Sequence, residues 1–165
     1  MKLPKSARIH HRSLQERLFL QGEKLHDFPL RIIWNALTPE ELKSNFRDRV
    51  PDLIGPVQVL VSVPKKKRRK AVDRVLMRRR IREAFRLNRA PLLDAVKKTG
   101  KVRTLSVGVI FMKEANVPYR TIEDKLVKLM ARLSEKLKEK YRTEEESEEE
   151  KNNEESALEA ADTAD

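Results

Sequence analysis

The sequence predicts an α+β fold in which helices cover a β-sheet. Three segments, residues 28–37, 57–63 and 105–111, have the length and apolar composition of strands. Amphipathic segments with apolar residues three and four positions apart alternate with them. The order helix, strand, short helix, strand, helix, strand, helix is typical of one sheet packed against helices, and 165 residues provide for one such domain plus extensions.

The first two predicted helices begin with capping-box patterns. Residues 13–16 are SLQE and residues 38–41 are TPEE, so in each case a hydroxyl and a Glu three positions later can satisfy backbone N–H groups at the helix start. Pro39 suits the first position of the second helix, where a missing N–H is tolerated. The first helix is expected to end near Gly22, because glycine favours helix C-termini.

The next two elements lie on either side of a lysine-rich run. Residues 57–63 are almost continuously apolar, which predicts a strand buried on both faces. A helical period begins near Ala71, and Pro91 ends or redirects this helix before a shorter helical segment that closes at Gly100. The helix from Ala71 is expected to turn one apolar side inward, formed by Val72, Leu76, Met77, Ile81, Ala84 and Leu87.

The strongest periodic signal lies after the third strand. A helix ending near Tyr141 is predicted, because apolar residues recur there at steps of three and four. These residues are Ile122, Leu126, Leu129, Met130, Leu133 and Leu137.

The charge of the chain is divided sharply between its parts. Residues 143–165 contain eleven acids and one lysine and carry −10; since the whole chain carries +11, residues 1–142 carry +21. A tail this acidic, without aromatic residues, buries little apolar surface and is expected to be disordered. We therefore expect a flexible N-terminus at residues 1–9, one folded domain at residues 10–142 and a disordered tail at residues 143–165.

Residues 65–89 contain thirteen Lys or Arg but only two acids, Asp73 and Glu83. Like charges on one helical face repel, so folding alone does not account for them, whereas an anionic polymer does. Arginine also binds phosphate with a planar fork of donors. The segment thus predicts a helix lying on a nucleic-acid backbone, and the alternative is a solvated, salt-bridged face. Four arginines of the helix are spaced four apart: Arg74, Arg78, Arg82 and Arg86.

No pattern in the sequence indicates a protein catalyst. His10, His11 and His26 lack metal-ligand spacing, and four glycines do not form a phosphate-binding loop. The absence of cysteine excludes disulfides and thiolate metal sites. No segment has the length and apolarity of a secretory signal or a membrane span, so the chain is expected to be soluble and cytoplasmic.

Residues 65–88 resemble the signature of the bacterial ribonuclease P protein component. In that family a strand ending in Ser-Val-x-Lys-Lys leads into a basic helix of the form Ala-Val-x-Arg-Asn-Arg-x-Lys-Arg-x-x-Arg-Glu. Here residues 61–66 are VSVPKK and residues 71–83 are AVDRVLMRRRIRE. The resemblance extends to the flanking elements and covers about residues 10–140.

The chain departs from the family signature in the middle of the basic helix. Val75 and Leu76 stand where the family has Asn and Arg, which removes one amide and one guanidinium. The additional positive charges of Arg80 and of residues 67–70 are candidates to replace this lost guanidinium. Residues 38–56 resemble an insertion between the first two strands.

The resemblance implies a small α/β sandwich whose central, mainly antiparallel sheet includes a left-handed β-α-β crossover carrying the basic helix. It also implies that the RNA subunit is the catalyst, that Mg²⁺ is held mainly by that RNA, and that the protein binds this RNA and the 5′ leader of precursor tRNA. A cleft lined by Phe19 and Trp34 is expected to receive the leader. A single aromatic residue is more often part of a core than a stacking platform, and for Trp34 both positions stay open. The expected RNA-binding residues are Lys65, Lys66, Lys67, Arg68, Arg69, Lys70, Arg74, Arg78, Arg79, Arg82 and Arg86.

The predicted function is therefore that of the protein subunit of ribonuclease P, which promotes endonucleolytic removal of the leader in tRNA 5′ maturation. A non-catalytic RNA- or DNA-binding protein, ribosomal or nucleoid-associated, has the same charge and stays open as the alternative. A stand-alone protein nuclease would need a cluster of acids that the sequence lacks.

Overall fold

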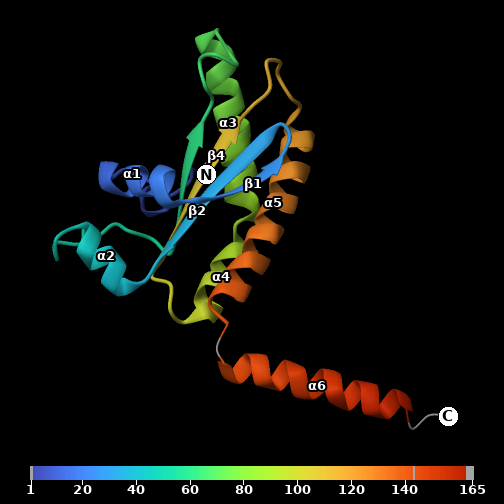
Figure 1. The fold of residues 1–165 in the computed structure, drawn as a ribbon. Coiled ribbons are helices and arrows are strands. Elements are labelled where there is room, and N and C mark those ends of the chain that lie inside the picture. The colour runs from blue at the N-terminus through green and yellow to red at the C-terminus, as the bar shows by residue number, and fades with distance from the viewer. Residues whose placement is uncertain (1, 143, 163–165) are drawn as a thin grey trace.

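The computed structural model describes residues 2–142 and 144–162 of the chain. One four-stranded sheet has helices on both faces (Figure 1). The strands are β1 (Glu23–Asp27), β2 (Leu30–Leu37), β3 (Val57–Ser62) and β4 (Thr104–Phe111). The helices are the short 3-10 helix η1 (Lys5–Ala7), α1 (Arg12–Gln21), α2 (Pro39–Asn45), α3 (Ala71–Asn88), α4 (Ala90–Thr99), α5 (Tyr119–Lys140) and α6 (Glu144–Asp162).

The sheet has the strand order β1-β2-β4-β3 and is antiparallel except for its last pair. β3 and β4 are parallel neighbours, and α3 and α4 connect them. In Figure 1 both strands point upward and α3 passes behind the sheet while the chain moves from β3 on the left to β4 on its right, which makes the crossover left-handed. Such connections are rare in proteins, and this one confirms the predicted fold class.

The two faces of the sheet have separate cores. The larger core lies under α3, α4 and α5 and contains Trp34, Phe85 and Phe111. The smaller one lies under α1 and α2 and consists of Ile9, Leu14, Leu18, Ile33, Leu37, Leu42 and Ile54.

Gly22 allows α1 to end directly against β2. A Cβ atom at this position would lie 2.3 Å from the carbonyl oxygen of Leu18 and 2.4 Å from Cγ2 of Ile33, both too close for any side chain. The Gly22 N–H also donates to the Leu18 oxygen at 2.9 Å and closes the last turn. The predicted end of the first helix is confirmed, and its cause is close approach to the sheet.

One of the two predicted capping boxes forms. The Glu41 N–H donates to Thr38 Oγ1 at 3.3 Å, and the Thr38 N–H donates to Glu41 Oε2 at 3.4 Å. The box at residues 13–16 was a wrong prediction: α1 begins at Arg12 with no side-chain cap. The hydroxyl of Ser13 instead accepts a hydrogen bond from Asn45 Nδ2 at 3.1 Å, which joins α1 to the end of α2.

β1 is a strand that the sequence analysis did not predict. Among its five residues only Leu25 is buried, so the segment carries almost no apolar periodicity. Its backbone nevertheless pairs along its whole length with β2, from Glu23 opposite Trp34 to Asp27 opposite Leu30. Pairing with a neighbouring strand, which is a tertiary interaction, therefore fixes this element.

The expectation of a flexible N-terminus at residues 1–9 was wrong for the described part of that segment. Leu3, Ala7 and Ile9 are buried, and the Ile9 N–H donates to the oxygen of Val59 at 3.2 Å. Arg8 forms a parallel bridge with Val59. The physical reason is that β3 is an edge strand, whose unpaired backbone groups the N-terminal segment satisfies.

The expectation of a disordered tail at residues 143–165 differs from the structure, which describes residues 144–162 as helix α6. Glutamate, alanine and leucine are strong helix formers, which favours a helix even without a core to pack against. Residues 148–161 are exposed throughout, and Figure 1 shows α6 extending away from the sheet. Residues 143 and 163–165 lie outside the described residues. Among the helices of the described ranges, none combines the length and apolarity needed to cross a membrane.

Candidate nucleic-acid interface

α3 packs on the sheet through a stripe narrower than the sequence predicts. Met77, Ile81, Ala84 and Phe85 are buried, and Leu76 is partly buried against the same core. Two residues expected to face inward are exposed, since Val72 has 79% and Leu87 has 55% of its surface accessible. At 3.6 residues per turn, Val72 and Leu87 lie about 180° and about 120° around the helix from buried Ile81, so both point away from the core. The rest of the helix surface is available to arginine side chains.

Two of the four regularly spaced arginines are already occupied within the protein. Arg74 donates to the carbonyl oxygens of Arg68 at 2.9 Å and Arg69 at 2.7 Å. Arg86 forms an ion pair with Glu83 at 2.6 Å, and this hydrogen bond lowers the pKa of the Glu83 carboxyl. The first of these contacts closes the loop before α3, and the second neutralises one of the two acids of the basic segment.

The other two, Arg78 and Arg82, have no hydrogen-bond or ion-pair partner among the residues that the structure describes, and neither does the exposed Arg79. Partial burial lowers the pKa of Arg82, and the positive charges of Arg78 and Arg8 lower it further. A carboxylate partner would have the opposite effect on this pKa. The middle of α3 therefore carries positive charge that the described part of the protein does not balance.

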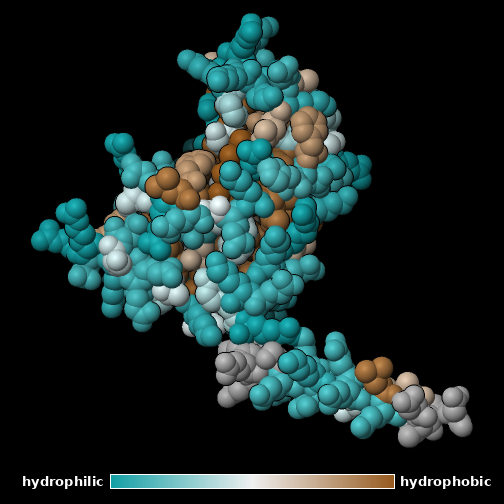
Figure 2. Space-filling model, in the orientation of Figure 1, coloured by the Kyte–Doolittle hydropathy of each residue, from teal (hydrophilic) through white to brown (hydrophobic). Residues whose placement is uncertain are grey.

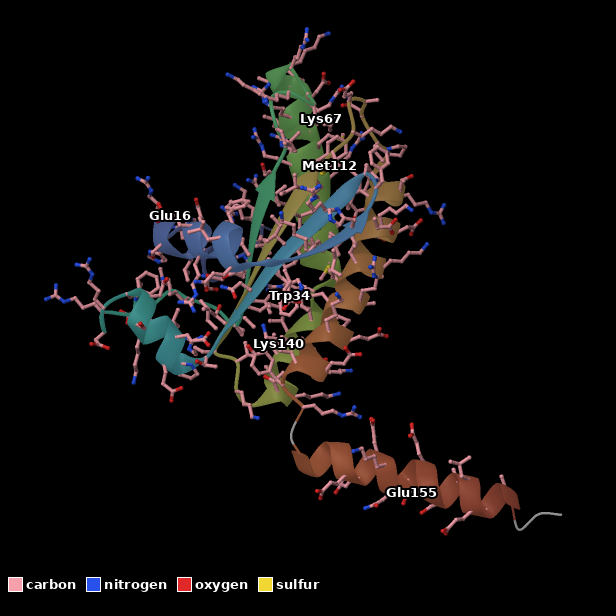
Figure 3. The ribbon with its side chains drawn as sticks, in the orientation of Figure 1. Glu16, Trp34, Lys67, Met112, Lys140 and Glu155 are labelled. Atoms are coloured by element: carbon pink, nitrogen blue, oxygen red, sulfur yellow. The ribbon has the colours of Figure 1, made fainter. Side chains whose placement is uncertain are left out.

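The loop between β3 and α3 adds a second group of cations at the start of the helix. Four of these side chains are exposed: Lys65, Lys66, Arg69 and Lys70. Lys67, labelled in Figure 3, is half-buried. The loop encloses a surface hollow of about 410 Å³ together with Arg68, Asp73 and Glu114. Figure 2 shows this end of the molecule as a mostly hydrophilic surface.

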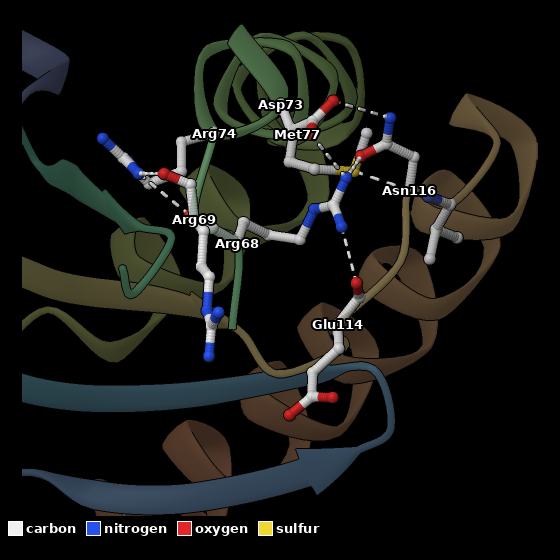
Figure 4. A network of polar contacts seen from close by, with 8 residues as sticks. Arg68, Arg69, Asp73, Arg74, Met77, Glu114 and Asn116 are labelled. Carbon is white, nitrogen blue, oxygen red and sulfur yellow. Dashed lines mark hydrogen bonds and ion pairs between the residues drawn. The ribbon is translucent and has the colours of Figure 1, made fainter. Parts of the chain in front are cut away.

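Arg68 differs from its neighbours because its guanidinium is used inside the protein (Figure 4). Only 14% of the side chain is exposed, and it forms an ion pair with Asp73 Oδ2 at 3.0 Å. It also donates to the carbonyl oxygen of Glu114 at 2.5 Å and to Oδ1 of Asn116, while Asn116 Nδ2 donates to Asp73 Oδ1 at 3.2 Å. Arg68 thus ties the basic loop and the first turn of α3 to the segment that precedes α5.

The expected pair of cleft aromatics does not form. Trp34 is 1% exposed and belongs to the core under α5, where Lys140 Nζ lies 5.4 Å from the centre of its ring (Figure 3). Phe19 is 48% exposed on α1, which covers the opposite face. Ile33 packs under α1, so Trp34, one position further along β2, must point the other way. The assignment of Trp34 to the leader cleft was therefore wrong.

The α1 face of the sheet has a half-buried row that the sequence analysis missed. Arg31 of β2 lies opposite Ile110 of β4, which in turn lies opposite Ser62 of β3. These three residues and Leu60 are partly exposed on the same face as the Ile33 core contact. We call Arg31, Leu60, Ser62 and Ile110 the sheet strip. Strict alternation counted from buried Ile33 would have identified it, but the register of β2 was not known from sequence.

The described residues do not gather several potential metal ligands in one place. No group of three or more His, Asp or Glu side chains converges within residues 2–142 and 144–162 in a way that could hold a metal ion. Because Mg²⁺ is usually held by one or two carboxylates together with phosphate oxygens of a partner, this observation concerns only sites built by the protein alone.

These features define a class of protein: an α/β sandwich that presents a basic helix and loop to a polyanion. The sequence profile of the family described as Ribonuclease P matches residues 3–134 of the chain. The ribonuclease P protein component of Porphyromonas gingivalis strain W83 is 30% identical over 132 residues, which is 80% of this chain and 86% of that protein.

Solved structures agree on the fold. The Staphylococcus aureus RNase P protein matches with a TM-score of 0.53 and 18% identity over 79% of this chain and 96% of that one. The Thermotoga maritima RNase P protein matches with a TM-score of 0.52 and 20% identity over 76% of this chain and 96% of that one.

The chain belongs to the ribonuclease P protein family. It is accordingly a protein subunit of ribonuclease P with a role in tRNA 5′ maturation, and its partner is the RNA of that ribonucleoprotein. The matched region begins at residue 3, inside the segment expected to be a flexible N-terminus. None of these matches supports the ribosomal or nucleoid-associated alternative.

Proposed function

We propose that this chain is an accessory subunit whose RNA partner performs catalysis, and that it binds both the catalytic RNA and the 5′ leader of precursor tRNA in the cytoplasm. The observation that carries the proposal is the positive charge of α3 and its preceding loop. Arg78, Arg79 and Arg82 have no acidic partner in the described parts of the chain. A phosphate backbone supplies the missing negative charge.

The binding surface is held rigidly, which favours it as a docking site for structured RNA. Arg78 and Arg82 lie on a helix fixed by buried Met77 and Ile81, and Arg68 and Arg74 fix the loop. Contacts from such a surface to phosphate oxygens set the position of a protein on its RNA without reading its sequence. This role suits a subunit that must dock on one structured RNA.

The sheet strip and Phe19 are the proposed site for the leader. The strip offers the aliphatic surface of Leu60 and Ile110 beside the guanidinium of Arg31, and Phe19 contributes an exposed ring on the neighbouring helix. Single-stranded nucleic acid binds to such surfaces by stacking on aromatic rings while cations contact its backbone. The strip ends at Ser62, shortly before Lys65 and Lys66, so a leader along it would reach the basic loop.

Magnesium belongs, in this proposal, to the RNA partner. Residues 1–142 carry +21, and a protein of this charge reduces the repulsion between the two RNAs where they meet. The metal would activate water and stabilise the leaving oxygen at the cleaved phosphodiester. The contribution of the chain's own residues is to bind, to position and to lower the electrostatic cost of assembly.

The test is cleavage of precursor tRNA by a matching catalytic RNA at low magnesium concentration, with and without the protein. We expect the protein to accelerate cleavage over RNA alone. The double variant Arg78→Met/Arg82→Met should lose most of the acceleration, whereas Arg12→Met should keep it, because Arg12 is exposed and paired with Glu16 at 2.8 Å. Equal rates with and without the unmodified protein would refute the proposal.

A further inference from the structure

Arg8 lies beside the edge strand β3 of the sheet, outside the basic helix and loop. Its bridge to Val59 aligns the N-terminal segment parallel to β3. The Ile9 N–H donates to Val59 oxygen at 3.2 Å, and Gln58 Nε2 donates to the carbonyl oxygens of Ser6 at 3.3 Å and Arg8 at 3.5 Å. The backbone at Arg8 is therefore held in place on the sheet.

The register directs the Arg8 side chain toward α3. Paired residues on neighbouring strands point to the same face, and Val59 belongs to the core under α3, α4 and α5. Ile9, the next residue, belongs to the opposite core under α1, as alternation requires. On α3, Arg78 and Arg82 are four residues apart and share one side of the helix.

These three guanidinium groups form a cluster that the described part of the protein leaves without negative charge. None of them has a carboxylate partner there. Arg8 is half-buried, and its Nε is shielded from solvent with no hydrogen-bond acceptor. Arg8 projects from the edge of β3 to the side of the sheet that α3 covers, and the positive charges of Arg78 and Arg8 lower the pKa of Arg82 in addition to its partial burial. A buried donor without an acceptor and an uncompensated cation cluster both point to an external anion.

We propose that Arg8, Arg78 and Arg82 together bind one phosphodiester group of an RNA backbone. The inference rests on the proposed function and extends it to a residue outside the basic helix. A phosphodiester has two non-bridging oxygens and one negative charge, and guanidinium forks on different elements can approach it from two sides. The phosphate belongs either to the catalytic RNA or to precursor tRNA, which share this chemistry.

The test uses the full-length chain with Arg8→Met, which keeps an unbranched side chain and removes the charge. Affinity is measured at several salt concentrations for the catalytic RNA alone and for precursor tRNA bound to the protein–RNA complex. Loss of one phosphate contact should reduce the slope of log K against log salt by about 0.7 to 0.9 and weaken binding on the order of tenfold. The partner for which this occurs contributes the phosphate.

Matched variants separate this site from a purely structural role. Arg12→Met should leave slope and affinity unchanged, because Arg12 is exposed and already paired with Glu16. The double variant Arg8→Met/Arg82→Met should lose less than the sum of the single losses, since both residues contact the same phosphate. Arg8→Lys should keep the slope but bind several-fold more weakly, because a point charge replaces a fork.

Two results would overturn the inference. One is an unchanged slope for folded Arg8→Met with both RNAs, particularly with a lowered unfolding temperature, which would make Arg8 structural. The other result applies if Arg8→Met does not fold. In that case, an unchanged affinity of Arg8→Lys for both RNAs would overturn the proposed site. In either case, binding of the unmodified chain to the catalytic RNA leaves the proposed function standing. No binding by the unmodified chain would instead remove the proposed function itself.

Discussion

At the scale of single residues, the guanidinium groups of α3 and its loop have two kinds of surroundings. Arg68 and Arg74 donate to backbone carbonyl oxygens, as does Arg80, which donates to Val117 oxygen at 2.6 Å. Arg78 and Arg82 make no such contact within the described residues. The sequence shows how few acids are available, but a carbonyl oxygen can also accept from arginine, and every residue has one. Which arginines are free therefore depends on tertiary structure.

Phe19 and Trp34 allow a direct comparison of an exposed aromatic with a buried one. Phe19→Ala should weaken binding of the precursor tRNA leader, because loss of one stacking platform costs about 1–3 kcal/mol, and should leave the unfolding temperature nearly unchanged. Trp34→Phe should lower the free energy of unfolding by about 1–2 kcal/mol through lost packing and leave leader affinity unchanged.

Affinity for precursor tRNA with and without its leader, together with thermal unfolding of each variant, checks this prediction. The difference between the two binding free energies gives the contribution of the leader to binding. A specific loss of leader binding in Trp34→Phe, without one in Phe19→Ala, would contradict the placement of these residues on opposite faces of the sheet.

At the scale of elements, α3 and the loop before it act as one prearranged unit. Arg68 connects the loop to Asp73 in the first turn of α3 and to Glu114 and Asn116 before α5. Arg74 connects the same turn back to the loop carbonyls. The lysines of the loop are thereby held near the start of α3 before RNA binds, which reduces the entropy lost on binding.

Arg68→Met and Arg69→Met should differ in which property they change, stability or the salt dependence of binding. Arg68→Met leaves Asp73 partly buried without its ion pair and should lower the free energy of unfolding by about 2 kcal/mol. It should weaken binding to the catalytic RNA without changing the salt slope, because the Arg68 guanidinium is engaged by Asp73, Glu114 and Asn116. Arg69→Met removes an exposed charge, so it should reduce the slope and leave the unfolding temperature unchanged.

Chemical denaturation and salt-dependent binding of the two variants measure both effects. A reduced slope for Arg68→Met with undiminished stability would show that its guanidinium is released to bind RNA and would contradict its role in the network.

How well each element was predicted depends on where its determinants lie. β3, β4, α3 and α5 follow from local apolar periodicity, and the cap at Thr38 from a local motif. β1 and the N-terminal segment depend on pairing with distant strands, which no local pattern contains. The helical period itself places Val72 and Leu87 away from buried Ile81, so their exposure could have been predicted from the sequence.

At the scale of the whole molecule, opposite charges occupy different parts of the chain. Residues 1–142 carry +21 and residues 143–165 carry −10. Figures 1 and 2 show α6 as a mostly hydrophilic helix that extends away from the body. Arg142, just before this helix, forms an ion pair with Glu150. An acidic segment linked to a basic surface competes with nucleic acid for that surface at a high effective concentration.

Deletion of residues 143–165 should therefore tighten binding to unrelated RNA several-fold at about 0.1 M salt and have little effect at about 1 M salt, where charges are screened within about 3 Å. The unfolding temperature should change little, because residues 148–161 are all exposed. Binding to an unrelated RNA and to the catalytic RNA, each with the full and shortened chain, measures the effect. Equal affinities at low salt would leave the tail without this competing role.

The overall topology shows the limit of reasoning from residues alone. Element order and periodicity predict helices covering a sheet, but general statistics favour a right-handed connection between the parallel strands β3 and β4. The left-handed crossover followed only from the resemblance to a known family. Its physical effect is to place α3 with α4 and α5 on one face and to leave the other face to α1 and α2.

The most direct test of the account is to locate the RNA relative to α3 by tethered cleavage. The chain has no cysteine, so Val75→Cys places a single hydroxyl-radical probe on an exposed position of α3, one turn before Arg79, while every arginine is kept. Lys43→Cys places the same probe on exposed α2, which covers the opposite face of the sheet. The account predicts localised cuts in the catalytic RNA from Val75→Cys and none from Lys43→Cys; cuts from Lys43→Cys alone would contradict it.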